Sequence, residues 1–178
     1  MKVFLLQRKR LTALACALAA AAMFYVVNYP AAVSAYATDR QLPIYCVQRD
    51  QKMLSISFDA AWGNEDTQQL IDILGKYNVK ATFFVVGSWV DKYPESVKAL
   101  HDAGHEVMNH SNDHAHMSQL SKEEIIADVE ACNDKIEAVT GVRPTLIRPP
   151  YGEYDNNVIT AIRSIGMEPI QWDVDSLD

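Results

Sequence analysis

Residues 81–109, ATFFVVGSWVDKYPESVKALHDAGHEVMN, decide the fold because they are typical of a strand, a helix and another strand in succession. Ala81–Val86 is a short apolar run of the kind that forms a buried strand. A helix is predicted next, with Pro94 in its first turn and Gly104 just past its end. Glu106–Asn109 is then another short strand. Two strands joined through a helix predict a parallel pair.

The same alternation continues on both sides of this stretch. Apolar residues recur at helical spacing between further short apolar runs, and Ser121 with Glu124 forms a capping box at the start of the longest helical pattern. The remaining elements are predicted strands at Met53–Phe58, Thr145–Ile147 and Met167–Val174, and helices over 70–77, 121–141 and 158–166. The predicted fold class is α/β with a parallel sheet, either doubly wound or rolled into a barrel.

The charge distribution argues against a nucleic-acid-binding protein. The chain has 178 residues and a formal net charge of -7, although its first ten residues carry four basic side chains and no acid precedes Asp39. The remainder is therefore more acidic still, and it lacks the basic stripe that nucleic acid requires. A composition of 49% hydrophobic and 22% charged residues is typical of a globular protein.

The N-terminal segment has the layout of an export signal. After the basic cluster comes Leu11–Val27, which is apolar except for Thr12, and then Ala35-Tyr36-Ala37, a small-residue cleavage pattern. The alternative is an uncleaved anchor in the bacterial membrane. Either alternative places the rest outside the cytoplasm, secreted or anchored, in the cell wall or on the extracellular face. The expected organisation is a signal peptide or anchor at 1–37, a connector at 38–51 and a catalytic domain at 52–178.

Polar side chains follow the predicted strands at the points where these end. Asp59, His110, Arg148 and Asp175 each come just after the last apolar residue of a strand. In parallel α/β folds, the carboxyl ends of the strands form the edge where ligands bind. We therefore expect these four residues to lie near one another.

The segment His110-Ser-Asn-Asp-His114 is a candidate metal site. Two imidazoles four residues apart share one face of a helical turn, and zinc favours nitrogen ligands. The alternative is a surface turn that happens to contain histidines. Of the two neighbouring histidines, His105 is expected to orient the turn and His116 to be solvated.

Two further segments have a functional and a structural interpretation. Asp59 would ligate a metal or take a proton from water, or would only cap the next element. Arg148-Pro-Pro-Tyr-Gly152 is a rigid loop that would hold a guanidinium and the Tyr151 N–H in fixed directions, or would be a plain connector with an exposed arginine. Trp62 is a candidate sugar-stacking residue, with core packing as its alternative.

Taken in order, four segments resemble the motifs of the polysaccharide deacetylase family, also called the nodulation-protein-B homology domain or carbohydrate esterase family 4. The resemblance runs from about Met53 to the last residue. It rests on Ser57-Phe-Asp59, His110-Ser-Asn-Asp-His114, Arg148-Pro-Pro-Tyr-Gly152 and Asp175-Ser-Leu-Asp178.

The resemblance implies a deformed (β/α) barrel with a divalent metal, zinc first and cobalt as an alternative. It implies that His110 and His114 bind the metal and that Asp59 is the catalytic base, steered by Arg148. The Tyr151 N–H would stabilise the oxyanion. The remaining implied site residues are Asp178 as a further catalytic residue of the fourth motif, and Pro149, Tyr151 and Trp62 as substrate contacts.

The sequence departs from the family pattern at two places. Ala60 stands where the family has a second Asp that binds the metal, a change that resembles a sporulation-associated subgroup. Asp59, Glu65 or Asp66 would have to complete the ligand set. The sequence also stops at Asp178, before the fifth motif, so we expect a barrel that is incomplete at its C-terminus.

The expected function is hydrolytic removal of N-acetyl groups from N-acetylhexosamine units of a cell-wall polysaccharide. Peptidoglycan is the first choice of substrate, with a setting in spore formation. The alternatives are a deacetylase of chitin oligomers and a catalytically impaired protein that binds wall glycan. The expected partners are an N-acetylated glycan polymer and the membrane through the N-terminal segment. No protein partner is predicted.

Overall fold

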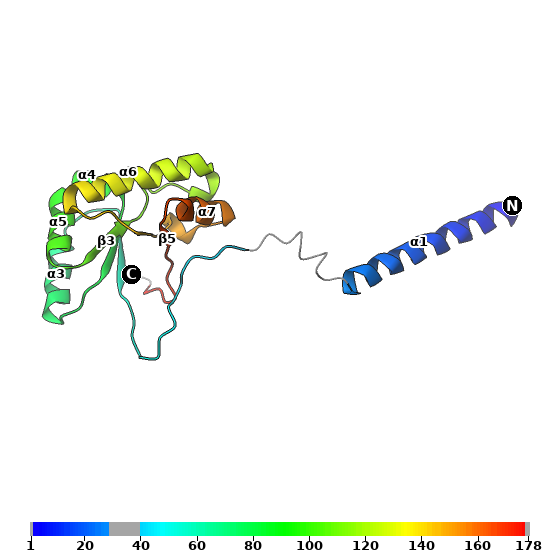
Figure 1. Cartoon of the computed structure of the whole chain (residues 1–178), viewed down its shortest axis with the longest axis horizontal. Helices are drawn as coiled ribbons and strands as arrows, with labels where there is room; N and C mark the ends of the chain where they lie inside the picture. The colour runs from blue at the N-terminus through cyan, green and yellow to red at the C-terminus, as the bar shows by residue number, and fades with distance from the viewer. Residues whose placement is uncertain (1, 29–39, 177–178) are drawn as a thin grey trace. The chain divides into compact units, whose positions relative to one another are not determined.

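The computed structural model describes residues 2–28 and 40–176, and the chain divides into two compact units, Met1–Arg40 and Gln41–Asp178 (Figure 1). The first unit contains one helix, α1 (Lys2–Asn28). Within the described ranges, no helix is long and apolar enough to cross a membrane. The predicted cleavage pattern at Ala35-Tyr36-Ala37 lies outside the described residues, as does Asp178.

The second unit is built on a parallel sheet whose strands follow one another in chain order, β1-β2-β3-β4-β5. Its strands are β1 (Ser57–Ala60), β2 (Thr82–Val85), β3 (Glu106–Asn109), β4 (Leu146–Ile147) and β5 (Glu168–Pro169). A doubly wound sheet reverses its strand order at a switch point, whereas this order never reverses. The winding is therefore that of a (β/α) barrel, one of the two alternatives that the sequence left open.

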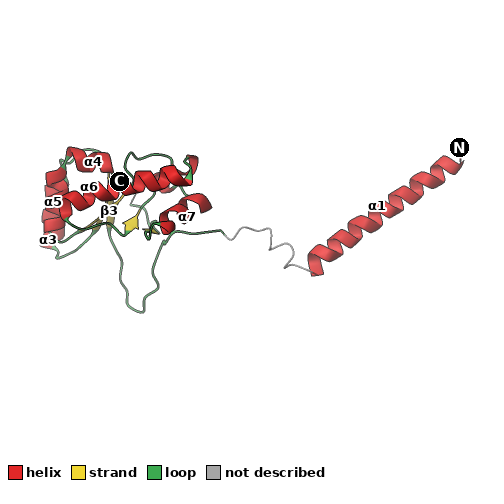
Figure 2. Ribbon diagram, turned by 45° about the horizontal axis from the view of Figure 1, so that its top comes forward, coloured by secondary structure: helices red, strands yellow, loops and turns green. Residues whose placement is uncertain are grey.

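Each pair of neighbouring strands is joined through at least one helix. Figures 1 and 2 show these helices packed along the strands of the second unit. They are α3 (Thr67–Lys76), α4 (Gly87–Lys92), α5 (Pro94–Asp102), α6 (Lys122–Thr140) and α7 (Asn156–Ser164), with short 3-10 turns η1 (Met117–Gln119) and η2 (Pro150–Gly152). The capping box of Ser121 and Glu124 starts α6, and Gly141, with φ 74°, ends it as predicted.

The two faces of the sheet have different surroundings, as β2 shows. Phe83 and Val85 belong to a hydrophobic cluster formed with residues of the covering helices. Phe84 lies between them in sequence, so its side chain points to the other face, where it meets the guanidinium of Arg148 at 4.3 Å. The inner face of the curved sheet therefore carries the polar groups of the site.

Two predicted strands differ from the observed ones. The sequence predicts the first at Met53–Phe58, but β1 starts at Ser57, and Met53 and Leu54 are 69% and 82% exposed. Among the described residues β1 pairs only with β2, so Met53 and Leu54 have no second strand beside them. The fifth is predicted at Met167–Val174, but the ladder covers only Glu168 and Pro169, followed by one isolated bridge from Ile170 to Ile44.

The beginning of the predicted connector is hydrogen-bonded to the end of the sheet. The Ile44 N–H donates to the Pro169 carbonyl oxygen at 2.9 Å, and the Gln171 N–H donates to that of Ile44 at 2.8 Å. The Gln41 N–H donates to Asn156 Oδ1 at 2.8 Å. These contacts tie residues 41–44 to the second unit. The domain boundary expected at residue 52 stays a prediction.

Candidate active site

The site is organised by an ion pair between Asp59 on β1 and Arg148, which follows β4. Arg148 Nη1 donates to Asp59 Oδ1 at 2.7 Å, and its Nη2 donates to Ser57 Oγ at 2.7 Å. Ser57 and Asp59 are two residues apart on one strand, so they share a face and together match the planar fork of the guanidinium. The carboxylate of Asp59 is thereby held in one orientation.

Arg148 is buried, which rules out the alternative of an exposed arginine in a plain connector. It is 5% exposed, and its guanidinium carbon lies 4.3 Å from the ring centre of Phe84 and 5.5 Å from that of Trp172. Trp172 can approach because Gly152 has no side chain, since a Cβ there would lie 2.9 Å from the indole. Aromatic faces stabilise the cation where water is excluded.

His110 lies next to this ion pair with its ring orientation fixed. Its Nδ1–H donates to the main-chain carbonyl oxygen of Arg148 at 2.6 Å, which leaves Nε2 as the free nitrogen. Nε2 lies 3.8 Å from Asp59 Oδ2. Burial lowers the pKa of His110, although Asp59 opposes the shift. When the ring is neutral, the lone pair of Nε2 lies on the side of the carboxylate, where it is available to a metal ion.

His114 faces His110 across the loop that joins them. The two ring centres are 5.0 Å apart, and the His114 N–H donates to Ser111 Oγ at 2.8 Å. Burial lowers the pKa of His114, and its Nδ1 is buried without a hydrogen-bond partner among residues 2–28 and 40–176. Ser111 and His114 both have positive φ, at 69° and 54°, so this loop is a tight turn and not a regular helix.

The donor chemistry of these side chains fits a divalent cation in part. Two imidazoles lie beside each other here and one of them faces a carboxylate, while His114 Nδ1 is a buried nitrogen with no hydrogen bond to the described residues. In the described ranges, however, no three His, Cys, Asp or Glu side chains converge as a ligand set. His110 and His114 are therefore the residues that would hold a metal, with Asp59 facing it.

Glu65 and Asp66, the other residues considered for the third ligand, line a hollow beside β1. This hollow has a volume of about 200 Å³ and is also lined by Asp59, Ala60 and Trp62. Glu65 Oε2 accepts a hydrogen bond from the Asn64 N–H at 2.9 Å, so this oxygen stabilises the local turn. Ala60 packs against the hydrophobic cluster that includes residues of the helices. It follows Asp59 on the strand, so its side chain points to the opposite face of the sheet.

Exposed aromatic side chains lie next to His114. Tyr151 is 59% exposed and has φ 61°; its ring lies 4.6 Å from that of His114 and stacks at 4.2 Å on His116. His116 is exposed, as expected, and its Nδ1 also pairs with Glu153 Oε2 at 3.1 Å. Trp62 is 85% exposed, 6.1 Å from His114, and does not pack in the core.

The remaining predicted residues are placed as follows. Pro149 is buried, whereas Tyr151, two residues further on, is accessible. Asp178, outside the described residues, stays a prediction. Of the residues that sequence reasoning missed, Ser57 could have been found, because it lies two positions from Asp59 on the same strand. Trp172 could not, because its contact with Arg148 exists only once β5 lies beside β4.

Comparison with known proteins identifies the family. The profile of the family described as polysaccharide deacetylase matches residues 47–170. The chain therefore belongs to the polysaccharide deacetylase family, as the four motifs predicted.

Three curated relatives are similar to this chain, which spans less than half of the length of each. YlxY of Bacillus subtilis, an uncharacterized protein, is 37% identical over 76% of this chain and 43% of its own length. The peptidoglycan-N-acetylmuramic acid deacetylase PdaC of the same species is 39% identical over 74% of this chain and 28% of its own length. The peptidoglycan-N-acetylglucosamine deacetylase PgdA of Listeria monocytogenes is 36% identical over 73% of this chain and 27% of its own length.

Solved structures support the barrel assignment. BA3943 from Bacillus anthracis, described as a pseudoenzyme of carbohydrate esterase family 4, superposes with a TM-score of 0.74 at 37% identity, over 77% of this chain and 49% of that one. PdaC of Bacillus subtilis superposes with a TM-score of 0.64 at 40% identity, over 72% of this chain and 62% of that one. The fold is thus the deformed barrel of this family.

Proposed function

We propose that the chain removes N-acetyl groups by hydrolysis from N-acetylhexosamine units of a bacterial wall glycan, with peptidoglycan as the preferred substrate. The observation that carries the proposal is the carboxylate of Asp59, held by buried Arg148 and facing Nε2 of His110. Family membership and the names of PdaC and PgdA support the choice of substrate.

The residues of the site divide the hydrolysis among them. A divalent ion, zinc or in its place cobalt, would supply Lewis-acid polarisation of the acetamide carbonyl. Asp59 would accept a proton from the attacking water, in the orientation that Arg148 and Ser57 impose. The Tyr151 N–H is the candidate donor to the developing oxyanion, and breaking the C–N bond would release acetate and a free amine.

The proposal includes a location outside the cytoplasm, in the wall or as a secreted protein, and a setting in spore formation. A basic cluster followed by an apolar run supports export. The setting is supported by Ala60, which resembles the sporulation-associated subgroup.

A second candidate function is glycan binding without hydrolysis. Two observations favour it: Ala60 removes the carboxylate that the family motif uses for the metal, and a pseudoenzyme is among the similar solved structures. Exposed Trp62 and Tyr151 would then contact sugar rings without turnover. Such binding would be indifferent to a metal chelator, whereas deacetylation would not.

The deciding experiment measures acetate released from peptidoglycan fragments and from chitin oligomers, with the full chain loaded with zinc or cobalt. His110→Ala is the control, because it removes one proposed metal ligand. Release that the control abolishes supports deacetylation and ranks the two glycans. A folded chain that binds the glycan in the presence of chelator but releases no acetate would refute it and establish the second function.

A further inference from the structure

The loop between His110 and His114 is held by a buried amide at the end of β3. Asn109 is 0% exposed, and its Oδ1 accepts the Ser111 N–H at 2.7 Å. Ser111 Oγ accepts the His114 N–H in turn. A positive φ such as that of Ser111 is uncommon outside glycine and needs surrounding contacts to maintain it. Asn109 provides such a contact.

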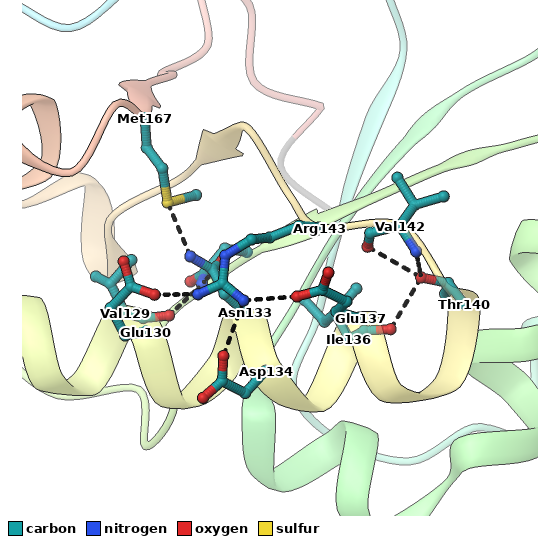
Figure 3. A network of polar contacts seen from close by, with 11 residues as sticks. Val129, Glu130, Asn133, Asp134, Ile136, Glu137, Thr140, Val142, Arg143 and Met167 are labelled. Carbon is teal, nitrogen blue, oxygen red and sulfur yellow. Dashed lines mark hydrogen bonds and ion pairs between the residues drawn. The ribbon is translucent and has the colours of Figure 1, made fainter.

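Helix α6 fixes the orientation of this amide. Asn109 Nδ2 donates to the Val129 carbonyl oxygen at 2.9 Å and to Asn133 Oδ1 at 2.8 Å. Asn133 is 1% exposed, and its own Nδ2 donates to Met167 Sδ at 3.2 Å (Figure 3). If the Asn109 amide flipped, its NH₂ would face the Ser111 N–H, two donors in contact. The bonds to α6 therefore keep the oxygen toward the loop.

The same helix contacts the next residue of the loop directly. Asp128 Oδ1 accepts the Asn112 N–H at 2.9 Å. Asp128 and Asn133 are five residues apart on α6, so one helix reaches the loop at two successive backbone groups, through Asn109 at Ser111 and through Asp128 at Asn112. A loop bound at successive backbone groups has few alternative conformations.

We propose that Asn133 and Asp128 are positioning residues, which hold the His110–His114 loop so that the two imidazoles face each other. Asn133 acts through Asn109, and Asp128 acts through the loop backbone. These contacts are made by protein groups alone. The proposal therefore goes beyond deacetylation and holds equally for a chain that only binds glycan.

Backbone amide hydrogen exchange, measured by NMR on the full chain without added metal, tests this proposal. Asn133→Leu keeps the size of the side chain and removes its amide. We expect the Ser111 and His114 N–H groups to exchange at least about tenfold faster, the effect of losing one buried hydrogen bond. The Phe84 N–H, on the interior strand β2, should keep its rate once any change in global stability is subtracted.

Met167→Leu is the matched control, because it removes the sulfur partner of Asn133 and leaves the bond between Asn133 and Asn109 intact. Loop exchange should then stay within about twofold of the wild-type rate. If Met167→Leu accelerates the loop as much as Asn133→Leu does, or if exchange rises uniformly over the unit, Asn133 is merely structural and the proposal is wrong.

A second pair of variants tests Asp128 separately. Asp128→Ala should accelerate exchange of the Asn112 N–H, and Asp128→Asn should restore it, because the amide keeps an oxygen acceptor. Equal rates in the two variants would contradict the role of Asp128. A chain that shows the expected exchange but releases no acetate would refute the proposed enzyme and leave this inference standing.

Discussion

At the scale of single residues, the charge of Asp59 is the feature on which the proposed chemistry depends. Asp59→Asn keeps the shape of the side chain but removes the base and the negative charge that pairs with Arg148. We expect acetate release to fall at least about 100-fold in kcat/KM. Ser57→Ala, which removes only the second contact of the guanidinium, should have a much smaller effect. Unchanged turnover in Asp59→Asn would contradict the role given to this carboxylate.

The pH dependence of stability has a residue-scale source at His105, which precedes β3. Its Nδ1 accepts the Ala81 N–H at 3.3 Å, so the folded state holds the ring neutral. Burial, helped by Lys80, lowers the pKa of His105 below its ordinary value of 6.5. The unfolded chain therefore binds a proton first as the pH falls. Stability from this residue is complete above about pH 6.5 and is lost as the pH drops toward the folded pKa.

Urea unfolding at about pH 7.5 and about pH 5.5 checks this sign. The free energy of unfolding should decrease between these values more in the wild type than in His105→Gln, which keeps an acceptor but cannot be protonated. His110 and His114 also have lowered pKa values and contribute in the same direction, so only the difference between the two proteins reports His105. The same decrease in both proteins would contradict the prediction.

At the scale of elements, an ion-pair network reinforces α6 (Figure 3). Arg143 lies just beyond the helix and contacts Glu130, Asp134 and Glu137 on its exposed face. We expect Arg143→Ala to lower the free energy of unfolding by about 0.5–1 kcal/mol at low salt, and by less in 1 M salt because the charges are then screened.

Lys98→Ala supplies the matched control, because Lys98 makes a single exposed pair with Asp102 on α5. Its effect should be close to zero. An Arg143→Ala effect that did not shrink with salt would mean that packing of the side chain, and not its charge, stabilises the helix.

The elements that the sequence predicts best are those whose ends are marked by local chemistry. The capping box and Gly141 define α6, because both act within one turn of the backbone. The predicted bounds of β1 and β5 were wrong because a strand extends only as far as its partner strand pairs with it. The sequence of a strand does not show where that pairing begins and ends. The short α4 was missed because six residues show no periodicity.

The same distinction applies to the candidate site. Asp59, His110 and Arg148 were predicted because strand ends of a parallel sheet meet at one edge. Asp175, expected there with them, is exposed, and its proximity to the site stays a prediction. The contact of Asn109 with Asn133 was not predictable, because it exists only when α6 packs beside β3.

At the scale of the whole molecule, the second unit depends on residues that precede its sheet. A chain trimmed to residues 52–178 would lose the bridge of Ile44 to Ile170 and the bonds of Arg163 to Gln41 and Leu42. We expect it to be less stable than residues 41–178 by about 2 kcal/mol, since several hydrogen bonds are lost together. Urea unfolding of both chains measures the difference, and equal stability would favour the boundary predicted at residue 52.

The bond between His110 and the carbonyl oxygen of Arg148 separates two tasks of one position. The guanidinium at position 148 serves the carboxylate, whereas its main-chain oxygen orients the imidazole. A substitution of Arg148 would remove the contact with the carboxylate of Asp59 but keep the hydrogen bond to His110, because every amino acid has the same main-chain carbonyl group. A protein of this kind can therefore lose catalysis while His110 keeps its orientation. The orientation of the histidine ring alone does not show that the protein is an active enzyme.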